Sequence, residues 1–132
     1  MRVLLDTNVL VAALIAHGTC HEVLEHCIHH HELITSDELL EEFQGVMRQK
    51  FRFAQSEVRE AFQVLRGEMK IARPRALESP VCRDAEDDRV LAAAVGGEAA
   101  CIVTGDKDLL VHEEYPGIRI LSPERFWRFE QR

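Results

Sequence analysis

Acidic side chains follow two short apolar stretches of this sequence, at positions where carboxylates could hold a metal ion. Asp6 comes directly after the apolar run Arg2–Leu5, and Asp106 follows Cys101–Thr104, with Asp108 two residues on. If the two runs are neighbouring parallel strands, their carboxyl ends meet at one edge of a sheet and bring these carboxylates together. Each Asp also suits the N-cap of a following helix, so it is the pair of motifs that indicates a site.

A predicted helix that begins near Thr35 supplies another candidate. With about 100° between successive residues, its apolar stripe is centred between Leu39 and Phe43, and Glu42 lies at the edge of that stripe. The alternative for Glu42 is an ordinary solvated helix flank. The side chain therefore counts as a site residue only if the other acids lie nearby.

A second predicted helix begins in the segment DAEDDRVLAAAV. Asp84, Asp87 and Asp88 lie there on one face with Leu91, at helical spacing. The helix dipole favours acids in any first turn, and Asp84 in particular suits an N-cap. Asp87 and Asp88 are less fully explained in this way, and both remain candidates for a site.

Several carboxylates gathered in one place repel each other and raise one another's pKa values. Mg²⁺ or Mn²⁺ removes this cost, because hard cations prefer oxygen ligands. One ion, or a pair about 3.5–4 Å apart, can activate water and stabilise the transition state of phosphodiester hydrolysis. The acidic motifs therefore predict a divalent-metal site suited to nucleic-acid cleavage.

The elements that must position these acids alternate between strands and helices. Strands are predicted at Arg2–Leu5, Glu32–Thr35, Ile71–Ala72, Cys101–Thr104 and Ile118–Leu121. Helices are predicted at Val9–Ile15, Cys20–His29, from a capping box at Thr35–Glu38, at Gln55–Lys70, at Asp84–Val95 and after Ser122. This alternation predicts an α/β fold of three layers, with a mainly parallel sheet of four or five strands between helices.

Composition favours one globular domain over residues 1–132, with 46% hydrophobic and 30% charged residues. No apolar run approaches the roughly 20 residues of a membrane span, and Asp6 and Asn8 interrupt the one stretch that could resemble a signal peptide. The four cysteines form no C-x-x-C pair, which favours free thiols in a reducing compartment. We therefore expect a cytoplasmic protein without a membrane partner.

The charge is unevenly distributed along the chain. The formal net charge is −7, yet eight basic and three acidic residues lie between Arg48 and Arg75, a net +5 that leaves −12 for the rest. A metal site made of several carboxylates accounts for much of that acidic excess. The basic segment keeps a nucleic-acid partner possible despite the overall charge.

Four segments of the chain, in this order, resemble the acidic motifs of PIN domains: VLLDTNVL, TSDELLEEF, DAEDDRVLAAA and VTGDKDLL. The resemblance covers nearly the whole chain and is closest to bacterial and archaeal toxin-type members, including virulence-associated protein C-like toxins. It implies a Rossmann-like sheet flanked by helices and an endoribonuclease that cleaves RNA through water activated by Mg²⁺ or Mn²⁺. An antitoxin protein and a second copy of the chain are the partners it implies.

The resemblance also assigns roles to individual residues. By motif, the catalytic metal ligands are Asp6, Glu42, Asp88 and Asp106. Asp87 is the alternative to Asp88 as the third ligand, if the motif is aligned one residue earlier. Asp108 is a secondary ligand or hydrogen-bond partner. Asn8 and Thr104 match positions that order the site by hydrogen bonds. The number of metal ions stays open at this point.

The segment RQKFRF resembles the family's basic segment after the second acid. In that interpretation, Arg48, Lys50 and Arg52 hold RNA phosphates, and Phe51 or Phe53 stacks on a base. The alternative is that the two phenylalanines belong to the core and the cations solvate a turn.

Two further features have alternatives of their own. His26 and His30 are spaced i, i+4 and could ligate a metal, or they form a solvated helix end. Phe126, Trp127 and Phe129 could offer exposed contact area for a homodimer, or they close the core of a single chain.

Two other functions compete with the ribonuclease. A haloacid-dehalogenase-like phosphatase needs a second Asp two residues after its nucleophile, and that position holds Asn8 here. A catalytically inactive PIN-fold module that binds RNA or protein is the second, and the presence of every acid argues against it.

Overall fold

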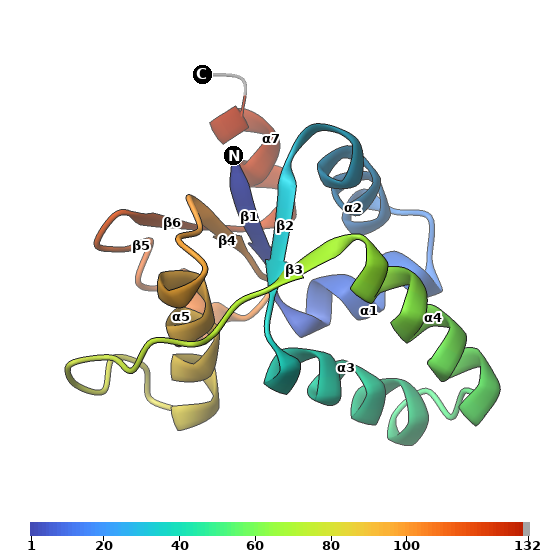
Figure 1. Cartoon of the computed structure of the whole chain (residues 1–132). Coiled ribbons are helices and arrows are strands. Elements are labelled where there is room, and N and C mark those ends of the chain that lie inside the picture. Colours follow the sequence, from blue (N-terminus) through green and yellow to red (C-terminus); the bar gives the residue numbers. More distant parts are fainter. Residues whose placement is uncertain (131–132) are drawn as a thin grey trace.

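Five parallel strands form the centre of the computed structural model, which describes residues 1–130. They are β1 (Arg2–Leu5), β2 (Glu32–Thr35), β3 (Met69–Ile71), β4 (Cys101–Val103) and β6 (Ile118–Leu121). A two-residue strand, β5 (Glu114–Tyr115), pairs antiparallel with β6 and completes the order β3-β2-β1-β4-β6-β5 (Figure 1). The predicted mainly parallel sheet is confirmed, with one short antiparallel edge strand in addition.

The helices form a layer on each face of the sheet. They are α1 (Thr7–Ile15), α2 (Thr19–His30), α3 (Asp37–Gln49), α4 (Gln55–Gly67), α5 (Ala85–Gly96), α6 (Lys107–Leu110) and α7 (Pro123–Glu130). The larger core packs one face against α1, α2, α3, α4 and α7, and the smaller core packs the other against α5 and α6 (Figure 1). In the described part of the chain, every helix is too short or too polar to cross a lipid bilayer.

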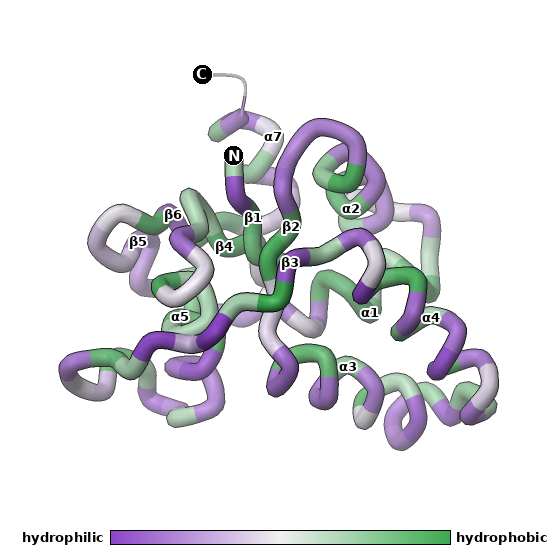
Figure 2. Tube along the Cα trace, viewed as in Figure 1, coloured by the Kyte–Doolittle hydropathy of each residue, from purple (hydrophilic) through white to green (hydrophobic). Residues whose placement is uncertain are grey.

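Strand β1 contributes side chains to both hydrophobic cores, because its residues alternate between the two faces of the sheet. Val3 and Leu5 belong to the larger core and Leu4 to the smaller one, because successive strand residues point to opposite faces. All three are at most 1% exposed, and burying a side chain of this kind contributes about 1.5–3 kcal/mol. Figure 2 shows the resulting hydrophobic centre in β1 and β2 beside the many hydrophilic residues of α3 and α4. All four cysteines are free thiols, as predicted.

The start of α3 differs in detail from the predicted capping box. Thr35 remains the last residue of β2, and Ser36 is the N-cap of α3, where its Oγ accepts a hydrogen bond from Leu39 N at 3.2 Å. Assigning Thr35 as the cap was therefore wrong, although the helix begins at the predicted place. Thr35 pairs with Ile71 in the β2–β3 ladder instead.

The helix predicted over Gln55–Lys70 ends earlier, at Gly67. The residues that follow form β3, which pairs with β2 through Leu33 and Met69 and their successors. Although Met69 and Lys70 fit a helical pattern, they form backbone hydrogen bonds with β2, whose edge would otherwise be unpaired. The predicted strand at Ile71–Ala72 is correspondingly shifted toward the N-terminus.

Gly96 fixes how α5 lies against the segment after β3. A Cβ atom at this position would lie 1.9 Å from the Arg73 carbonyl oxygen, so only glycine fits. Arg75 N donates a hydrogen bond to Ala92 O at 2.9 Å and secures the same approach. The predicted stop of this helix at two glycines is thus also a packing contact that sets the position of α5.

The aromatic residues of α7 close the core of the chain rather than standing exposed. Phe126 is 0% exposed, and Trp127 and Phe129 are partly buried against the larger core. Of the two alternatives, closure of the core of a single chain is the one that the structure shows, because α7 packs against the sheet and against α2.

Candidate metal centre

The candidate site lies where the order of the strands reverses. β1 leads through α1 and α2 to β2 on one side, while β4 flanks β1 on the other. The carboxyl ends of β1 and β4 are joined beyond the last paired residues by a hydrogen bond from Asp6 N to Val103 O at 2.9 Å. Ligands of parallel α/β sheets bind in the crevice at such a point.

Asp6 is the buried centre of the site, with 5% of its surface exposed. Its Oδ1 accepts from Thr7 N at 2.8 Å, and its Oδ2 accepts from the Thr104 hydroxyl at 2.8 Å and from Asn8 Nδ2 at 3.2 Å. These donors fix the orientation of the carboxylate. Asp6 is also the N-cap of α1. The helix-capping role and the role as a candidate metal ligand are therefore compatible.

Thr104 and Asn8 connect the ends of the two strands. The Thr104 hydroxyl donates to Asp6 and accepts from Asp106 N at 3.0 Å, while Asn8 Oδ1 accepts from Gly105 N at 3.0 Å. Asp106 Oδ1 accepts in turn from Asp108 N at 2.9 Å. The structure therefore places both predicted supporting residues between the two acidic motifs.

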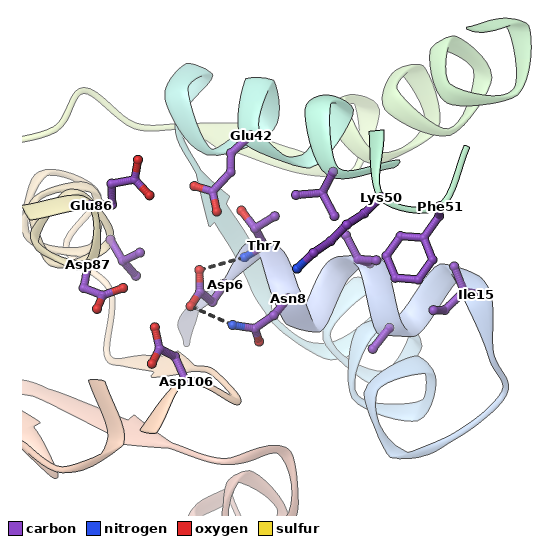
Figure 3. A pocket seen from close by; sticks show the side chains of 14 residues that line it. Asp6, Thr7, Asn8, Ile15, Glu42, Lys50, Phe51, Glu86, Asp87 and Asp106 are labelled. Atoms are coloured by element: carbon purple, nitrogen blue, oxygen red, sulfur yellow. Dashed lines mark hydrogen bonds between the residues drawn. The ribbon is translucent and has the colours of Figure 1, made fainter. Parts of the chain in front are cut away.

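Helices α5 and α3 bring further carboxylates to these acids. Asp87 comes from the first turn of α5, and one carboxylate oxygen each of Asp87, Asp106 and Asp108 lie within 4.8 Å of one another. Glu42 extends from the exposed edge of α3 on another side of Asp6 (Figure 3). Elements far apart in the sequence thus direct carboxylates toward one place.

The structure does not bring Asp88 into this group. Its carboxylate accepts hydrogen bonds from Val81 N at 3.2 Å and Cys82 N at 2.8 Å, and so secures the loop before α5. Partial burial would raise its pKa, but these backbone donors and the Cys82 thiol outweigh that effect and hold the pKa of Asp88 below its ordinary value. Asp87 occupies the position beside Asp106 instead.

A pocket of about 320 Å³ opens in front of the acids. One wall carries Asp6, Glu42, Asp87 and Asp106, together with Glu86, which the sequence analysis did not single out. Apolar side chains of α1 and α3 form the opposite wall, where Lys50 and Phe51 also lie (Figure 3). Of the three predicted RNA-binding cations, only Lys50 lines this pocket.

The electrostatics of the site disfavour the charged carboxylates. Burial raises the pKa of Asp6 and of Glu42, and the Asp6 charge adds to the effect at Glu42. Burial and the hydrogen-bonding neighbour Asp106 raise the pKa of Asp87 to about 7. Among residues 1–130, no salt bridge to a basic side chain neutralises Asp6, Glu42, Asp87, Asp106 or Asp108.

These residues fit a divalent cation such as Mg²⁺ or Mn²⁺. Every charged donor of the cluster is a carboxylate oxygen, the ligand that hard cations prefer. Burial, together with the charges of neighbouring acids, raises the pKa values of these carboxylates, and a bound cation would offset that cost. Asp6, Asp87 and Asp106, with Glu42 from α3, are the side chains positioned to hold it.

The stability of the metal-free protein should therefore depend on pH. Asp87 has a pKa of about 7 in the fold against an ordinary 3.8, so the folded state binds a proton that the unfolded chain has released. The free energy of unfolding should fall as the pH rises from about 4 to about 7 and level off above that. Thermal melts at pH 5–8 measure this slope.

Two controls isolate the cause of that slope. Asp87→Asn should flatten it, and so should saturating Mg²⁺, which favours the charged carboxylates in the fold. A slope unchanged in Asp87→Asn would assign it to other groups.

The fold and the site together define a class: a three-layer α/β domain with an acidic pocket where the strand order reverses. The sequence profile of the PIN domain matches residues 2–108. That match spans most of the chain, and the chain belongs to the PIN domain family.

Solved structures that are similar to this chain include one that aligns over most of its length. The crystal structure of VapBC2 from Rickettsia felis, bound to a DNA fragment from its promoter, aligns with a TM-score of 0.63 and 17% sequence identity. The alignment covers 91% of this chain and 97% of that one. At this identity the likeness confirms the fold. No curated protein matches the sequence.

Proposed function

We propose that this PIN domain is a metal-dependent endoribonuclease. The observation that carries the proposal is the convergence of Asp6, Glu42, Asp87 and Asp106 on one open pocket. A divalent cation bound there would supply an activated water and neutralise charge on the phosphodiester in the transition state.

Each acid has its own part in holding the cation. Asp6 is fixed by its hydrogen bonds, so it presents its carboxylate in one orientation. Asp106 is aligned by Thr104 and by Asp108 N. Burial and the neighbouring Asp106 raise the pKa of Asp87 to about 7, so Asp87 carries a proton in part of the metal-free protein at neutral pH. Cation binding displaces this proton, so metal affinity should increase up to about pH 7.

The third ligand in this proposal is Asp87, the competing register of the sequence analysis. The carboxylate of Asp88 accepts hydrogen bonds from the backbone N–H groups of Val81 and Cys82, and its role is to position the loop before α5. Asp108 remains a secondary ligand, because it lies beside Asp87 and Asp106.

The opposite wall of the pocket suits a single-stranded RNA. Lys50 extends from the end of α3 into the pocket (Figure 3), where its ammonium group can contact a phosphate. Phe51 follows it with 43% of its surface exposed, as a base-stacking side chain requires. Arg52, whose φ of 52° turns the chain away from the helix direction, and Arg48 would contact RNA only outside the pocket.

Lys50→Met should weaken RNA binding and reduce its salt dependence, while metal affinity stays near that of the wild type. Loss of one phosphate contact lowers the slope of log K against log salt by about 0.7 for single strands. Fluorescence anisotropy with a labelled RNA in Ca²⁺, across a salt series, measures the slope.

Arg59→Met, on the exposed face of α4, serves as the matched control for loss of one positive charge. Equal slopes for the two variants would remove Lys50 from the RNA-binding residues.

Mapping of new RNA ends tests the proposed activity. Total cellular RNA incubated with the purified chain and Mn²⁺ should acquire internal breaks at a limited set of positions. RNA that remains intact while the fold is native would favour the inactive RNA- or protein-binding module instead.

The biological role that we propose is that of a cytoplasmic toxin with an antitoxin partner. The resemblance to toxin-type PIN domains and the likeness to a VapBC assembly support it. Induced expression should arrest growth, Asp6→Asn should not, and a small protein encoded beside the gene should restore growth. Homodimer formation is part of the same proposal, and light scattering over a concentration series tests it.

A further inference from the structure

Two histidines and a glutamate converge at the end of the sheet opposite the acidic pocket. His26 lies in the last turns of α2, His31 directly precedes β2, and Glu130 ends α7. Nε2 of both histidines contacts the same oxygen, Glu130 Oε1, at 2.6 Å in the case of His31. These three donor atoms lie within 4.8 Å of one another. Three separate elements therefore direct metal-ligating atoms at a single point.

The three side chains are partly buried among aromatic residues. Their side-chain exposures are 27% for His26, 12% for His31 and 21% for Glu130. The His26 ring packs edge-on against Trp127, with centroids 4.9 Å apart, and His31 packs against Phe126 at 6.1 Å. The aromatic residues of α7 thus hold both imidazoles in place around the carboxylate.

We propose that His26, His31 and Glu130 form a binding site for Zn²⁺ or a similar divalent transition metal, separate from the acidic pocket. Two imidazole nitrogens and one carboxylate oxygen are a ligand set that Zn²⁺ accepts, with water as a fourth ligand. The acidic pocket offers oxygen alone and suits harder cations. The two sites should therefore select different metals.

The geometry requires only a small adjustment to receive the ion. In a tetrahedral zinc site with bonds of about 2.0–2.2 Å, the ligand atoms lie about 3.4 Å apart. The contacts with Glu130 Oε1 must open by about 1 Å to reach that separation, which side-chain rotation at the partly exposed surface allows. Each imidazole then carries its hydrogen on Nδ1, which leaves Nε2 free to bind the ion.

An ion at this point would join α7 to α2 and to the start of β2. Phe126, in the same helix as Glu130, is 0% exposed in the larger core, so holding α7 in place protects that core. The site is consequently a structural one. At a free Zn²⁺ concentration 100 times the Kd, the midpoint of thermal unfolding should rise by about 5–10 °C.

Zinc titration calorimetry tests the proposal, on a chain without a polyhistidine tag and in excess Mg²⁺ to occupy the acidic pocket. The wild type should bind one Zn²⁺ per chain, and Co²⁺ in its place should give the visible absorption of tetrahedral coordination. Glu130→Gln and His26→Gln should each weaken binding at least about 100-fold. Glu130→Gln keeps a hydrogen-bonding group beside the histidines, so its fold should be retained, which circular dichroism verifies.

His30→Gln is the matched control. The exposed His30 ring lies 4.6 Å from that of His26 but does not contact Glu130, so this variant should bind Zn²⁺ as the wild type does. Absence of Zn²⁺ binding by the wild type in Mg²⁺, or equal affinity in Glu130→Gln, would overturn the proposal and leave a hydrogen-bonded cluster. Loss of affinity in His30→Gln equal to that in His26→Gln would overturn it as well.

Discussion

RNA cleavage by Asp6→Asn should fall more than about 100-fold below that of the wild type at saturating Mg²⁺ or Mn²⁺. Changing an outer partner of a metal site commonly costs 10–100-fold, and Asp6 is the buried carboxylate at the centre of the proposed site. The substitution keeps the shape of the side chain and its acceptor for Thr7 N but removes the negative charge. Initial cleavage rates across a Mn²⁺ titration measure both the maximal rate and the apparent metal affinity.

The fold of this variant should survive. Replacing a buried carboxylate whose pKa is raised by burial relieves the cost of charging it, which offsets the loss of the hydrogen bonds that Oδ2 accepts from Asn8 and Thr104. The metal-free Asp6→Asn protein should therefore unfold at or above the wild-type temperature. Cleavage within a few-fold of the wild type would show that Asp6 holds no essential ion.

The second large effect distinguishes two adjacent acids. Asp87→Asn should reduce cleavage more than about 100-fold, because Asp87 shares the pocket with Asp6 and Asp106. Asp88→Asn should cleave at nearly the wild-type rate, but should lose about 1 kcal/mol of stability, because an amide can accept only one of the two loop hydrogen bonds. Cleavage assays and thermal melts on the same three proteins separate the two consequences.

Asp84→Asn provides the control for charge in this segment, because the exposed Asp84 caps α5 without lining the pocket. It should match the wild type in cleavage. If Asp88→Asn is the inactive variant and Asp87→Asn the active one, the register that the resemblance favoured is correct, and the arrangement of α5 described above is not.

Much of the fold follows from the sequence because periodicity and burial agree. The strands Arg2–Leu5 and Ile118–Leu121 are short apolar runs that fit only the sheet interior. The start of the edge strand β3 was harder to place, because Met69 and Lys70 continue the amphipathic pattern of α4 and only pairing with β2 overrides it. Tertiary hydrogen bonds decided that boundary, and no local signal in the sequence reports them.

The positions of site residues could be predicted where they directly follow a strand, because the end of the strand determines where the next side chain lies. Asp6 and Asp106 follow strands whose positions are unambiguous, so their convergence could be expected. The choice between Asp87 and Asp88 depended on the rotation of α5 about its axis. Buried Val90 and Leu91 lie three and four residues after Asp87, and this spacing was the available signal for the register.

Other site residues had no such signal. Glu86 reaches the pocket from the exposed side of α5, and the entry of Lys50 depends on the direction of the chain after α3. The histidine cluster shows the same limit. The sequence suggested His26 with His30 at helical spacing, whereas the structure joins His26 to His31 and to Glu130, about a hundred residues away.

The most direct test of the central claim is cleavage of one RNA identified by end mapping, measured before and after removal of divalent cations. The acidic site predicts that EDTA abolishes cleavage, that added Mn²⁺ or Mg²⁺ restores it to the original positions, and that Asp6→Asn stays inactive throughout. Cleavage that persists in EDTA, or that Asp6→Asn performs at the wild-type rate once Mn²⁺ is restored, would contradict it.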